Sequence, residues 1–377
     1  MGWIDALNRR QRDFKIYVHA EAEPDIVQEC GATPLFSFAP GARTIADPVT
    51  DQIDSFLRYS RLFARDCAVL SDAVNATDIL IVAFATEREL FGAAQWLATI
   101  PEARRPHLVF HFVTPDFRWA VNEDRSAIKG DVGYYRFAAN QLSEVSDRFH
   151  LFAGTDRLCR ALQGAFDRPV SLAPLPMAYP ASVDLPAHPD DPAWEPTPVG
   201  FVGEYRQEKG GAVLPDVIAR FRAARPDRRF FLQVQNATQA AAVSERIGHL
   251  DGLDIHTGQL SHRAYVSRLE TLEILLLPYM PGRYALRSSG IFAEAVAHGL
   301  VTVVPDKTWM ADQLAAGRGA GVTFKDHTAE SIAAALVAAN DTRAVLQAEA
   351  ATRRDAWRAA ECVDAFFDRI IERVETA

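Results

Sequence analysis

The chain has 377 residues and a net charge of −9, with 49% hydrophobic and 24% charged residues. This composition is typical of a folded globular protein and excludes a disordered one, and the length predicts two domains. The acidic balance argues against a nucleic-acid partner, although a local basic groove can still hold a phosphate-bearing ligand.

The four cysteines lie far apart and form no CxxC pair, so neither a zinc site nor a disulfide framework is predicted. No segment has the apolar length of a signal peptide or a membrane span, and we therefore expect a cytoplasmic protein. Near the N-terminus, Trp3, Ile4 and Leu7 precede three arginines. They predict either an ordinary first helix or an amphipathic helix in peripheral contact with a membrane.

The first half of the chain alternates short apolar segments with segments of helical period. The pattern predicts strands at 14–20, 78–84, 107–113, 149–155 and 169–175. It predicts helices at 48–73, 86–99 and 131–147. Such alternation builds a parallel sheet that helices cover, so the first domain is predicted to be α/β.

A proline-rich segment follows, with eight prolines between residues 173 and 198. Neither a helix nor a central strand tolerates that density, because proline lacks the backbone N–H that both require. We interpret 173–198 as a linker between domains, since proline-rich linkers stay extended.

The alternation then restarts. Strands are predicted at 198–205, 228–235, 253–260, 272–279, 301–305 and 321–324, and helices from about 209, at 238–249, at 261–271 and from about 288. The predicted fold class is α/β with two Rossmann-like, doubly wound domains, at 1–172 and 199–355, and a C-terminal helix in 356–377 that packs back on the first domain. Such domains bind ligands at the carboxyl ends of their strands, in a cleft.

The most informative local pattern is the strand, loop, helix and strand between residues 272 and 305. Ser288, Ser289 and Gly290 stand where the helix is expected to begin. Serine caps free amide groups there, and the amides and the helix dipole also favour an anion, with Arg287 adjacent. Gly290 would let a phosphate approach the backbone. The alternative is that these residues only cap the helix.

Glu294 lies on the same predicted helix, about one turn from its start, between apolar neighbours. Burying a carboxylate is costly unless hydrogen bonds compensate, and ribose hydroxyls would supply those bonds. The alternative is an exposed surface glutamate.

A second pattern is GFVGEYRQEKGG at 200–211, a strand followed by a glycine-flanked basic loop. Arg206 and Lys209 would lie over the carboxyl edge of the sheet, where two cations could neutralise a diphosphate. The pattern has the spacing of neither GxGxxG nor the P-loop. Its alternative interpretation is a pair of solvated loop charges.

With these segments in view, the C-terminal half resembles the donor domain of GT-B glycosyltransferases, in particular the retaining family 4. The segments that carry the resemblance are FVGEYRQEKG, HTGQL and SSGIFAEAVAHGLVTVVP, which follow one another in the family's order within residues 198–325. The resemblance implies a glycosyltransferase whose second domain binds a nucleotide-sugar donor.

The resemblance also implies roles for individual residues. Arg206 and Lys209 would be the catalytic cations on the donor phosphates, and Glu294 would hold the ribose. The remaining phosphate site would comprise Gly203, Arg287, Ser288, Ser289, Gly290 and Ile291. Gly258, Gln259 and Leu260 would lie beside the base.

Two positions depart from the family pattern. The family's motif has a further glutamate eight residues before Glu294, and here that residue is Leu286. The family also has an arginine directly after the strand glycine, where this chain has Glu204. The first departure affects the expected contact to the donor sugar, and the second affects the expected contact to the phosphates.

The first domain offers two histidines as candidate catalytic residues. His111 falls near the end of the predicted strand 107–113, where some family members place a histidine close to the transferred sugar, and His19 ends the first strand. A core or loop histidine is the alternative for each.

The predicted reaction moves a glycosyl group from a nucleotide diphosphate sugar to an acceptor hydroxyl on a glycan, a lipid or a small molecule. No DxD motif suggests a metal, and we expect no metal and no cofactor besides the donor, because cations can stabilise the leaving diphosphate. Two alternatives stay open: a sugar-nucleotide 2-epimerase of the same architecture, and a non-catalytic nucleotide-sugar binding module.

Overall fold

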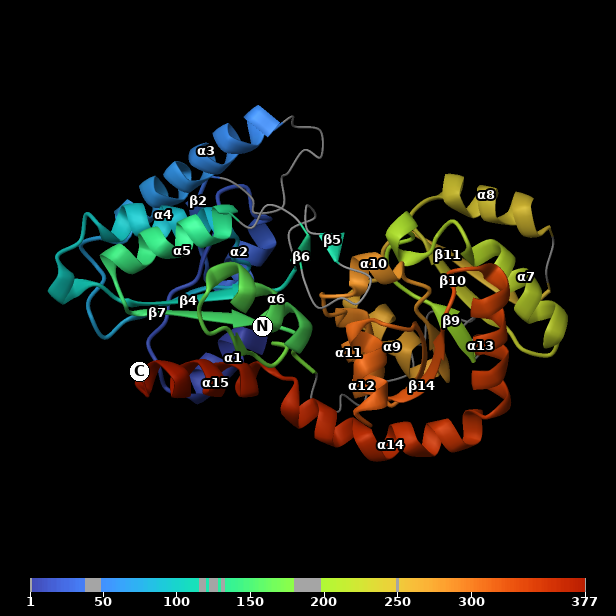
Figure 1. Ribbon diagram of the computed structural model, residues 1–377. Coiled ribbons are helices and arrows are strands. Elements are labelled where there is room, and N and C mark those ends of the chain that lie inside the picture. Colours follow the sequence, from blue (N-terminus) through green and yellow to red (C-terminus); the bar gives the residue numbers. More distant parts are fainter. Residues whose placement is uncertain are drawn as a thin grey trace. The chain divides into compact units, whose positions relative to one another are not determined.

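The computed structural model of the chain divides into two compact units, shown in Figure 1. The first comprises Met1–Ala178 and Val363–Ala377, and the second comprises Tyr179–Cys362. The structure describes residues 2–37, 49–114, 120–121, 128–129, 133–179, 198–248 and 251–376, with the backbone alone at 26, 49–52, 120–121 and 128–129. Of the predicted linker, residues 180–197 lie outside the described residues.

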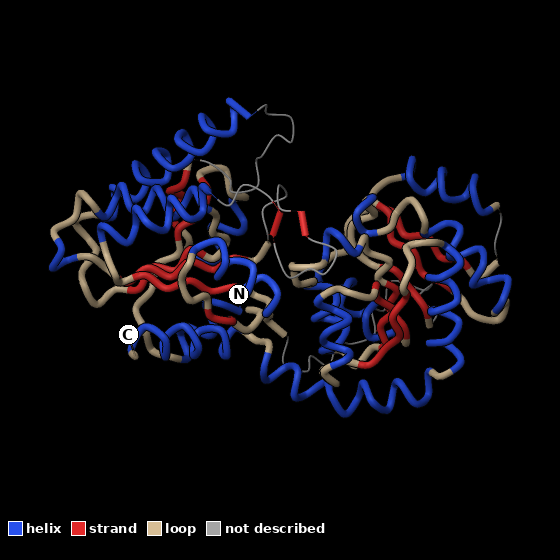
Figure 2. The backbone as a smooth tube through the Cα atoms, in the orientation of Figure 1, coloured by secondary structure: helices blue, strands red, loops and turns tan. Residues whose placement is uncertain are grey.

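The first unit contains parallel sheets, drawn red in Figure 2. Strand β1 (Tyr17–His19) pairs with β2 (Thr33–Phe36). A four-stranded sheet has the order β3 (Ile79–Val82), β4 (His107–Phe112), β7 (Phe149–Ala153) and β8 (Ser171–Leu172), and β5 (Ala120–Val121) forms an antiparallel pair with β6 (Ile128–Lys129). Five of the six residues of β4 are buried, as expected of an apolar strand covered on both faces.

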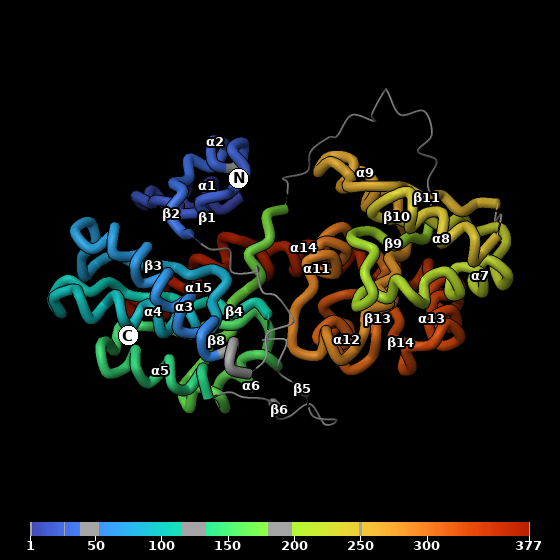
Figure 3. Tube along the Cα trace, turned by 90° about the horizontal axis from the view of Figure 1, so that it is seen from above, coloured from blue at the N-terminus to red at the C-terminus, as the bar shows by residue number. Residues whose placement is uncertain are grey.

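Helices cover both faces of the four-stranded sheet. In Figure 1, α3 (Val49–Cys67), α4 (Glu87–Leu97) and α5 (Gly133–Val145) lie on one face, and α1 (Gly2–Arg9) and α15 (Val363–Glu375) lie on the other. Figure 3 shows α3 and α4 side by side. The unit also contains α2 (Pro24–Cys30), α6 (Asp156–Phe166) and the short 3-10 helices η1 (Ala68–Leu70) and η2 (Glu102–Arg104).

The last helix of the chain completes the core of the first unit. Phe366 and Phe367 of α15 are at most 2% exposed and pack in one cluster with Val109 of β4 and Phe152 of β7. Trp3 of α1 joins them, with its ring centre 5.2 Å from both phenylalanine rings. The apolar face of α1, which the sequence offered for membrane contact, therefore lies against α15. No helix in the described ranges is both long enough and apolar enough to cross a membrane.

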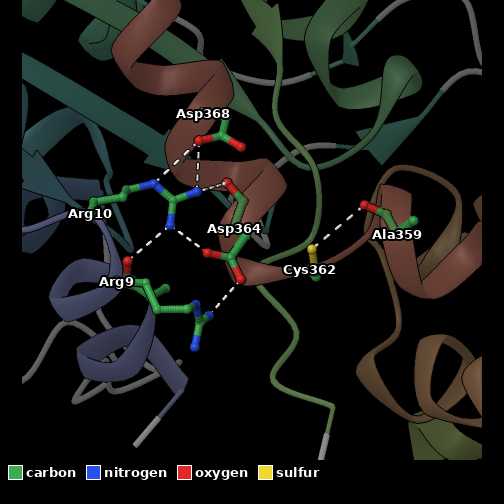
Figure 4. Close-up of polar contacts among 7 residues, drawn as sticks. Arg9, Arg10, Ala359, Cys362, Asp364 and Asp368 are labelled. Carbon is green, nitrogen blue, oxygen red and sulfur yellow. Dashed lines mark hydrogen bonds and ion pairs between the residues drawn. The ribbon is translucent and has the colours of Figure 1, made fainter. Parts of the chain in front are cut away.

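Arg9 and Arg10, at the end of α1, form ion pairs with aspartates of α15, as Figure 4 shows. The guanidinium of Arg10 donates to the carboxylates of Asp364 and Asp368, the latter at 2.6 Å, and to the carbonyl oxygen of Ala6 at 2.9 Å. Arg9 donates to Asp364 at 2.5 Å. Because hydrogen bonds between ions strengthen when water is partly excluded, the bonds of Arg10, whose side chain is 16% exposed, are expected to stabilise the unit.

Replacing Arg10 with alanine is expected to lower the free energy of unfolding of the first unit by about 1 kcal/mol. The matched control is Arg12→Ala, because Arg12 and its partner Glu375 are 57% and 61% exposed, and exposed pairs contribute little. Urea titration of both variants, followed by the fluorescence of the tryptophans, measures the difference. Equal losses in the two variants would contradict the assignment.

The second unit is built on a six-stranded parallel sheet. Its strands lie in the order β11 (Leu253–Thr257), β10 (Phe230–Val234), β9 (Val199–Phe201), β12 (Ile274–Leu276), β13 (Val301–Pro305) and β14 (Ala320–Phe324). Numbered within the unit, this is the order 3-2-1-4-5-6 of the Rossmann fold. The carboxyl ends of β9, β10 and β11 therefore lie next to one another.

Helices follow the strands of the second unit. They are α7 (Leu214–Ala224), α8 (Ala237–Ile247), α9 (His262–Thr271), α10 (Pro281–Tyr284), α11 (Gly290–Ala297), α12 (Trp309–Ala315), α13 (Ala329–Asp341) and α14 (Arg343–Ala360), and Figure 3 shows α11 and α14 side by side. The helix that the sequence predicts from about 209 begins at Leu214 instead. Lys209 ends a 3-10 helix, η3 (Gln207–Lys209), because the chain turns sharply at Gly210, whose φ is +85°.

Candidate functional site

A pocket of about 420 Å³ opens at the carboxyl ends of β9, β10 and β11 in the second unit. Its walls are the end of β10, the loops after the three strands and one side chain of α9. The lining residues are Gly203, Glu204, Gln233, Val234, Gln235, Gly258, Gln259, Leu260 and Tyr265. Doubly wound sheets bind ligands at this edge, and the pocket contains four residues that the sequence predicted for donor binding, Gly203, Gly258, Gln259 and Leu260.

Gly203 brings the pocket next to the first turn of α11. Its φ is +99°, and a Cβ atom there would lie 2.5 Å from Cδ1 of Ile291 and 3.8 Å from Nζ of Lys209. A side chain at this position would be strained by the backbone conformation and would collide with Ile291. The loop after β9 thus lies close to the start of α11 and to the amine of Lys209.

Lys209 lies beside Gly203, and two further cations, Arg206 and Arg287, lie near Lys209. The amine of Lys209 lies 3.9 Å from the carboxylate of Glu204, and its side chain is 14% exposed. Burial first, and then the positive charges of Arg206 and Arg287, lower the pKa of Lys209 to about 8. An anion bound here would relieve the repulsion among the three cations.

Arg206 is the most exposed of the three, with 48% of its side chain accessible. Its guanidinium forms ion pairs with Glu204 and, at 3.3 Å, with Glu208. Glu204 stands where the resemblance led us to expect an arginine, and its carboxylate contacts the cations instead. An anionic ligand would compete with Glu204 for Arg206.

Arg287 is held by an aromatic ring. Its guanidinium lies 4.8 Å from the centre of the Tyr284 ring, a cation–π contact that orients the group without neutralising it. Among the described residues, the buried Nε of Arg287 has no hydrogen-bond partner. This cation therefore keeps donor capacity for a ligand.

The start of α11 has the features of an anion site. The Ser289 hydroxyl, 5% exposed as a residue, accepts from the amide of Phe292 at 3.2 Å and so caps the helix. Ser288 precedes the cap, and Gly290 opens the helix with no atom within 4 Å of where its Cβ would stand. A ligand oxygen could approach the backbone at Gly290.

Glu294 is connected to the pocket through Tyr265. The Tyr265 hydroxyl donates to Oε2 of Glu294 at 2.5 Å, and the Tyr265 side chain lines the pocket. Burial raises the pKa of Glu294 above its ordinary value, while the bond from Tyr265 and the nearby His262 act in the opposite direction. The carboxylate is thus partly buried and hydrogen-bonded, in contrast to an exposed surface glutamate.

The histidines of the first unit have other surroundings. His111 is 1% exposed, its ring centre lies 5.0 Å from that of Phe366, and burial lowers its pKa to about 4. This is the environment of a core histidine, and the prediction that His111 faces a ligand does not fit it. His19 ends β1 and accepts a hydrogen bond at Nδ1 from the amide of Glu21 at 3.1 Å.

Leu286, which stands where the family pattern has a glutamate, is 2% exposed and belongs to the core. Within the described ranges, no three His, Cys, Asp or Glu side chains come together as a group that could hold a metal ion. Near the pocket, positive charge comes from Arg206, Lys209 and Arg287, and negative charge comes from Glu204, Glu208 and Glu294.

Four pocket residues were missed by the sequence reasoning: Gln233, Val234, Gln235 and Tyr265. Gln233 is the one polar residue of the strand FFLQV and is 7% exposed. A polar side chain inside an otherwise apolar buried strand was the signal that could have identified it, because buried amides need specific partners. Tyr265 has no comparable signal, since its position on α9 suits a core tyrosine equally well.

Solved structures with a similar fold are glycosyltransferases. A glycosyltransferase from Rickettsia africae is 10% identical with a TM-score of 0.66, and the match covers 100% of this chain and 93% of that one. Sucrose-phosphate synthase from Thermosynechococcus elongatus is 14% identical with a TM-score of 0.63, covering 99% and 92% of the two chains. HepE from Anabaena, in complex with UDP and glucose, is 13% identical with a TM-score of 0.59, covering 99% and 95%.

The sequence itself matches no protein-family model, and a search of curated proteins found no match. At these levels of identity, the similarity extends to the fold. The predicted α/β fold with two Rossmann-like domains, the GT-B fold of these glycosyltransferases, is confirmed.

Proposed function

We propose that this protein is a glycosyltransferase that moves a sugar from a nucleoside diphosphate sugar to an acceptor hydroxyl. The observation that carries the proposal is the gathering of Arg206, Lys209 and Arg287 beside the start of α11, next to a pocket at the carboxyl ends of three strands. That arrangement suits a ligand with a doubly charged group at one end and a flat, polar group at the other.

In the proposed reaction, the bond between the anomeric carbon and the diphosphate oxygen breaks, and the acceptor oxygen, which loses its proton, bonds to that carbon. Negative charge grows on the departing diphosphate. Lys209, Arg206 and Arg287 and the amides that open α11 would stabilise this charge, because they are already in place before the reaction begins.

The nucleoside would occupy the pocket itself. Gly258, Gln259 and Leu260 line the wall beside which the base would lie. Glu294, aligned by Tyr265, would accept hydrogen bonds from the ribose hydroxyls. The raised pKa of Glu294 would fall on binding, since these bonds stabilise the carboxylate.

The finer parts of the proposal rest on the sequence resemblance. They are membership of the retaining family 4, a reaction that needs no metal, acceptor binding by the first unit, and a place in polysaccharide or glycoconjugate synthesis. Known structures of similar fold support the nucleotide part, since the HepE complex contains UDP.

A binding screen tests the proposal. UDP, ADP, GDP, CDP and dTDP are added separately to the protein, and unfolding is followed by differential scanning fluorimetry. We expect one of them to stabilise the second unit, by about 2.7 kcal/mol at 100 times its Kd. Lys209→Ala and Glu294→Ala are expected to reduce the shift, while Lys15→Ala, an exposed lysine of the first unit, leaves it unchanged. Unchanged shifts in both pocket variants would refute the donor site.

Turnover separates the three functions that remain possible for such a site. With a radiolabelled nucleotide sugar, a transferase moves the label to an acceptor, a 2-epimerase converts the donor into its epimer without an acceptor, and a binding module leaves the donor intact. Transfer to an acceptor is the expected result.

A further inference from the structure

Gln233 joins the two loops that face each other across the pocket. Its Oε1 accepts from the amide of Gly203 at 2.7 Å, and its Nε2 donates to the carbonyl oxygen of Gly258 at 3.0 Å. The residue lies on β10, between β9 and β11, so its side chain reaches the loop after each neighbouring strand. At 7% exposure, the amide is shielded from water that would compete for these bonds.

Both partners are glycines at which the chain turns. The φ angle is +99° at Gly203 and +96° at Gly258. Gly203 is followed by the segment that carries Lys209, and Gly258 is followed by Gln259 and Leu260 on the pocket wall. The side chain of Gln233 thus forms a hydrogen bond to the glycine at which each loop turns.

We propose that Gln233 is a positioning residue that sets the distance between the phosphate-binding and nucleoside-binding halves of the donor site. The inference rests on the proposed function, because it takes the pocket to hold a nucleoside diphosphate. A ligand that spans both halves gains affinity from their fixed separation, since no binding free energy is then spent on ordering the loops.

The chemistry requires an amide at this position. An N–H group needs an acceptor and a carbonyl needs a donor, and glutamine supplies both on one rigid group. Methionine has nearly the same length and supplies neither. Glutamate keeps the acceptor for Gly203 but places a carboxylate against the carbonyl oxygen of Gly258.

The test compares Gln233→Met with the wild type in isothermal titration, at a temperature well below unfolding. The ligand is the tightest-binding nucleoside diphosphate among UDP, ADP, GDP, CDP and dTDP. We expect its Kd to rise at least tenfold in Gln233→Met and in Gln233→Glu. The separate halves, the free nucleoside and inorganic pyrophosphate, are expected to lose less than threefold in Gln233→Met, because neither spans both loops.

The matched control is Gln313→Met. Gln313 is a buried glutamine of the same unit, 5% exposed, whose side chain accepts from Arg318 at 3.0 Å. Both methionine variants are expected to lower the melting temperature, and the control is expected to keep the wild-type Kd. A purely structural role for Gln233 would give it the behaviour of the control.

The outcomes are distinct. A wild-type Kd in Gln233→Met, or equal losses for the nucleoside diphosphate and its halves, would overturn the inference. The proposed function would stay in place if Lys209→Ala still weakens binding of the nucleoside diphosphate. If the wild-type protein binds none of the five nucleoside diphosphates, the proposed function and the inference fall together.

Discussion

Replacing Lys209 with alanine is expected to lower kcat/KM for the nucleotide-sugar donor by about two to three orders of magnitude, the usual effect of removing one preorganised donor to a developing negative charge. The amine is mostly buried, with 14% of the side chain exposed, and lies next to Gly203 and the first turn of α11. Its charge is therefore poorly screened by water and is directed at the proposed diphosphate site.

The pH dependence of the same residue gives a second readout. Because the pKa of Lys209 is lowered to about 8, the amine loses its proton as the pH rises through 8, and nucleotide affinity is expected to fall there. Lys209→Arg keeps a charge at all these pH values, so its affinity is expected to be insensitive between pH 7 and 9. Wild-type kcat/KM in Lys209→Ala, or an affinity that does not change with pH, would show that the amine does not meet the diphosphate.

The strands of the second unit could be predicted from the sequence, because most of them are apolar segments that a turn with glycine follows. The strand VTVVP was expected at 301–305 and is β13 at Val301–Pro305. Gly203, which follows β9 and precedes the basic loop, lies against Ile291 in the first turn of α11, with Lys209 nearby. In this fold, strand order follows from the alternation, and strand order determines which loops meet.

Shorter elements were missed where the periodic signal is weak. Helix α12 has 7 residues and α10 has 4, too few for an apolar face to repeat. Helix α6 was also missed, although Thr155 caps it and Leu158, Leu162 and Phe166 form its buried side. In that case the signal was present in the sequence, at helical spacing directly after a strand.

Side-chain partners across the fold could not be predicted. The bonds of Gln233 to Gly203 and Gly258 join residues 30 and 25 positions apart, and the bond from Tyr265 to Glu294 spans 29. Each depends on the distance between neighbouring strands and on a rotamer that packing selects. A sequence pattern gives the face on which a residue lies, but it does not give the atom that the side chain reaches.

Acidification is expected to destabilise the protein between pH 6.5 and pH 4, because buried histidines must take up protons. The pKa values of His111 and His150 are lowered from 6.5 to about 4, chiefly by burial, and the two residues are 1% and 6% exposed. At these two histidines, the unfolded chain then binds more protons than the folded one throughout this range. The contribution of the neutral histidines to the free energy of unfolding is fully present above pH 6.5 and is lost as the pH falls towards 4. For a residue such as His111, the loss is about 3 kcal/mol.

His111 and His150 belong to the first unit, and burial also lowers the pKa of His298 in the second unit to about 4. With two such histidines against one, the first unit is expected to lose more stability on acidification. Lowered carboxyl pKa values, such as that of Asp364, act below 3.8, outside this window. Urea titration at pH 7, 6, 5 and 4 measures the slope, and His111→Phe is expected to reduce it by up to about 1.4 kcal/mol per pH unit while keeping a ring against Phe366. The matched control makes the same change at His19, which is only partly buried at the end of β1. The folded unit holds His111 neutral. If the free energy of unfolding changed with pH equally in His111→Phe and in the wild type, proton uptake by His111 would not be a cause of acid unfolding.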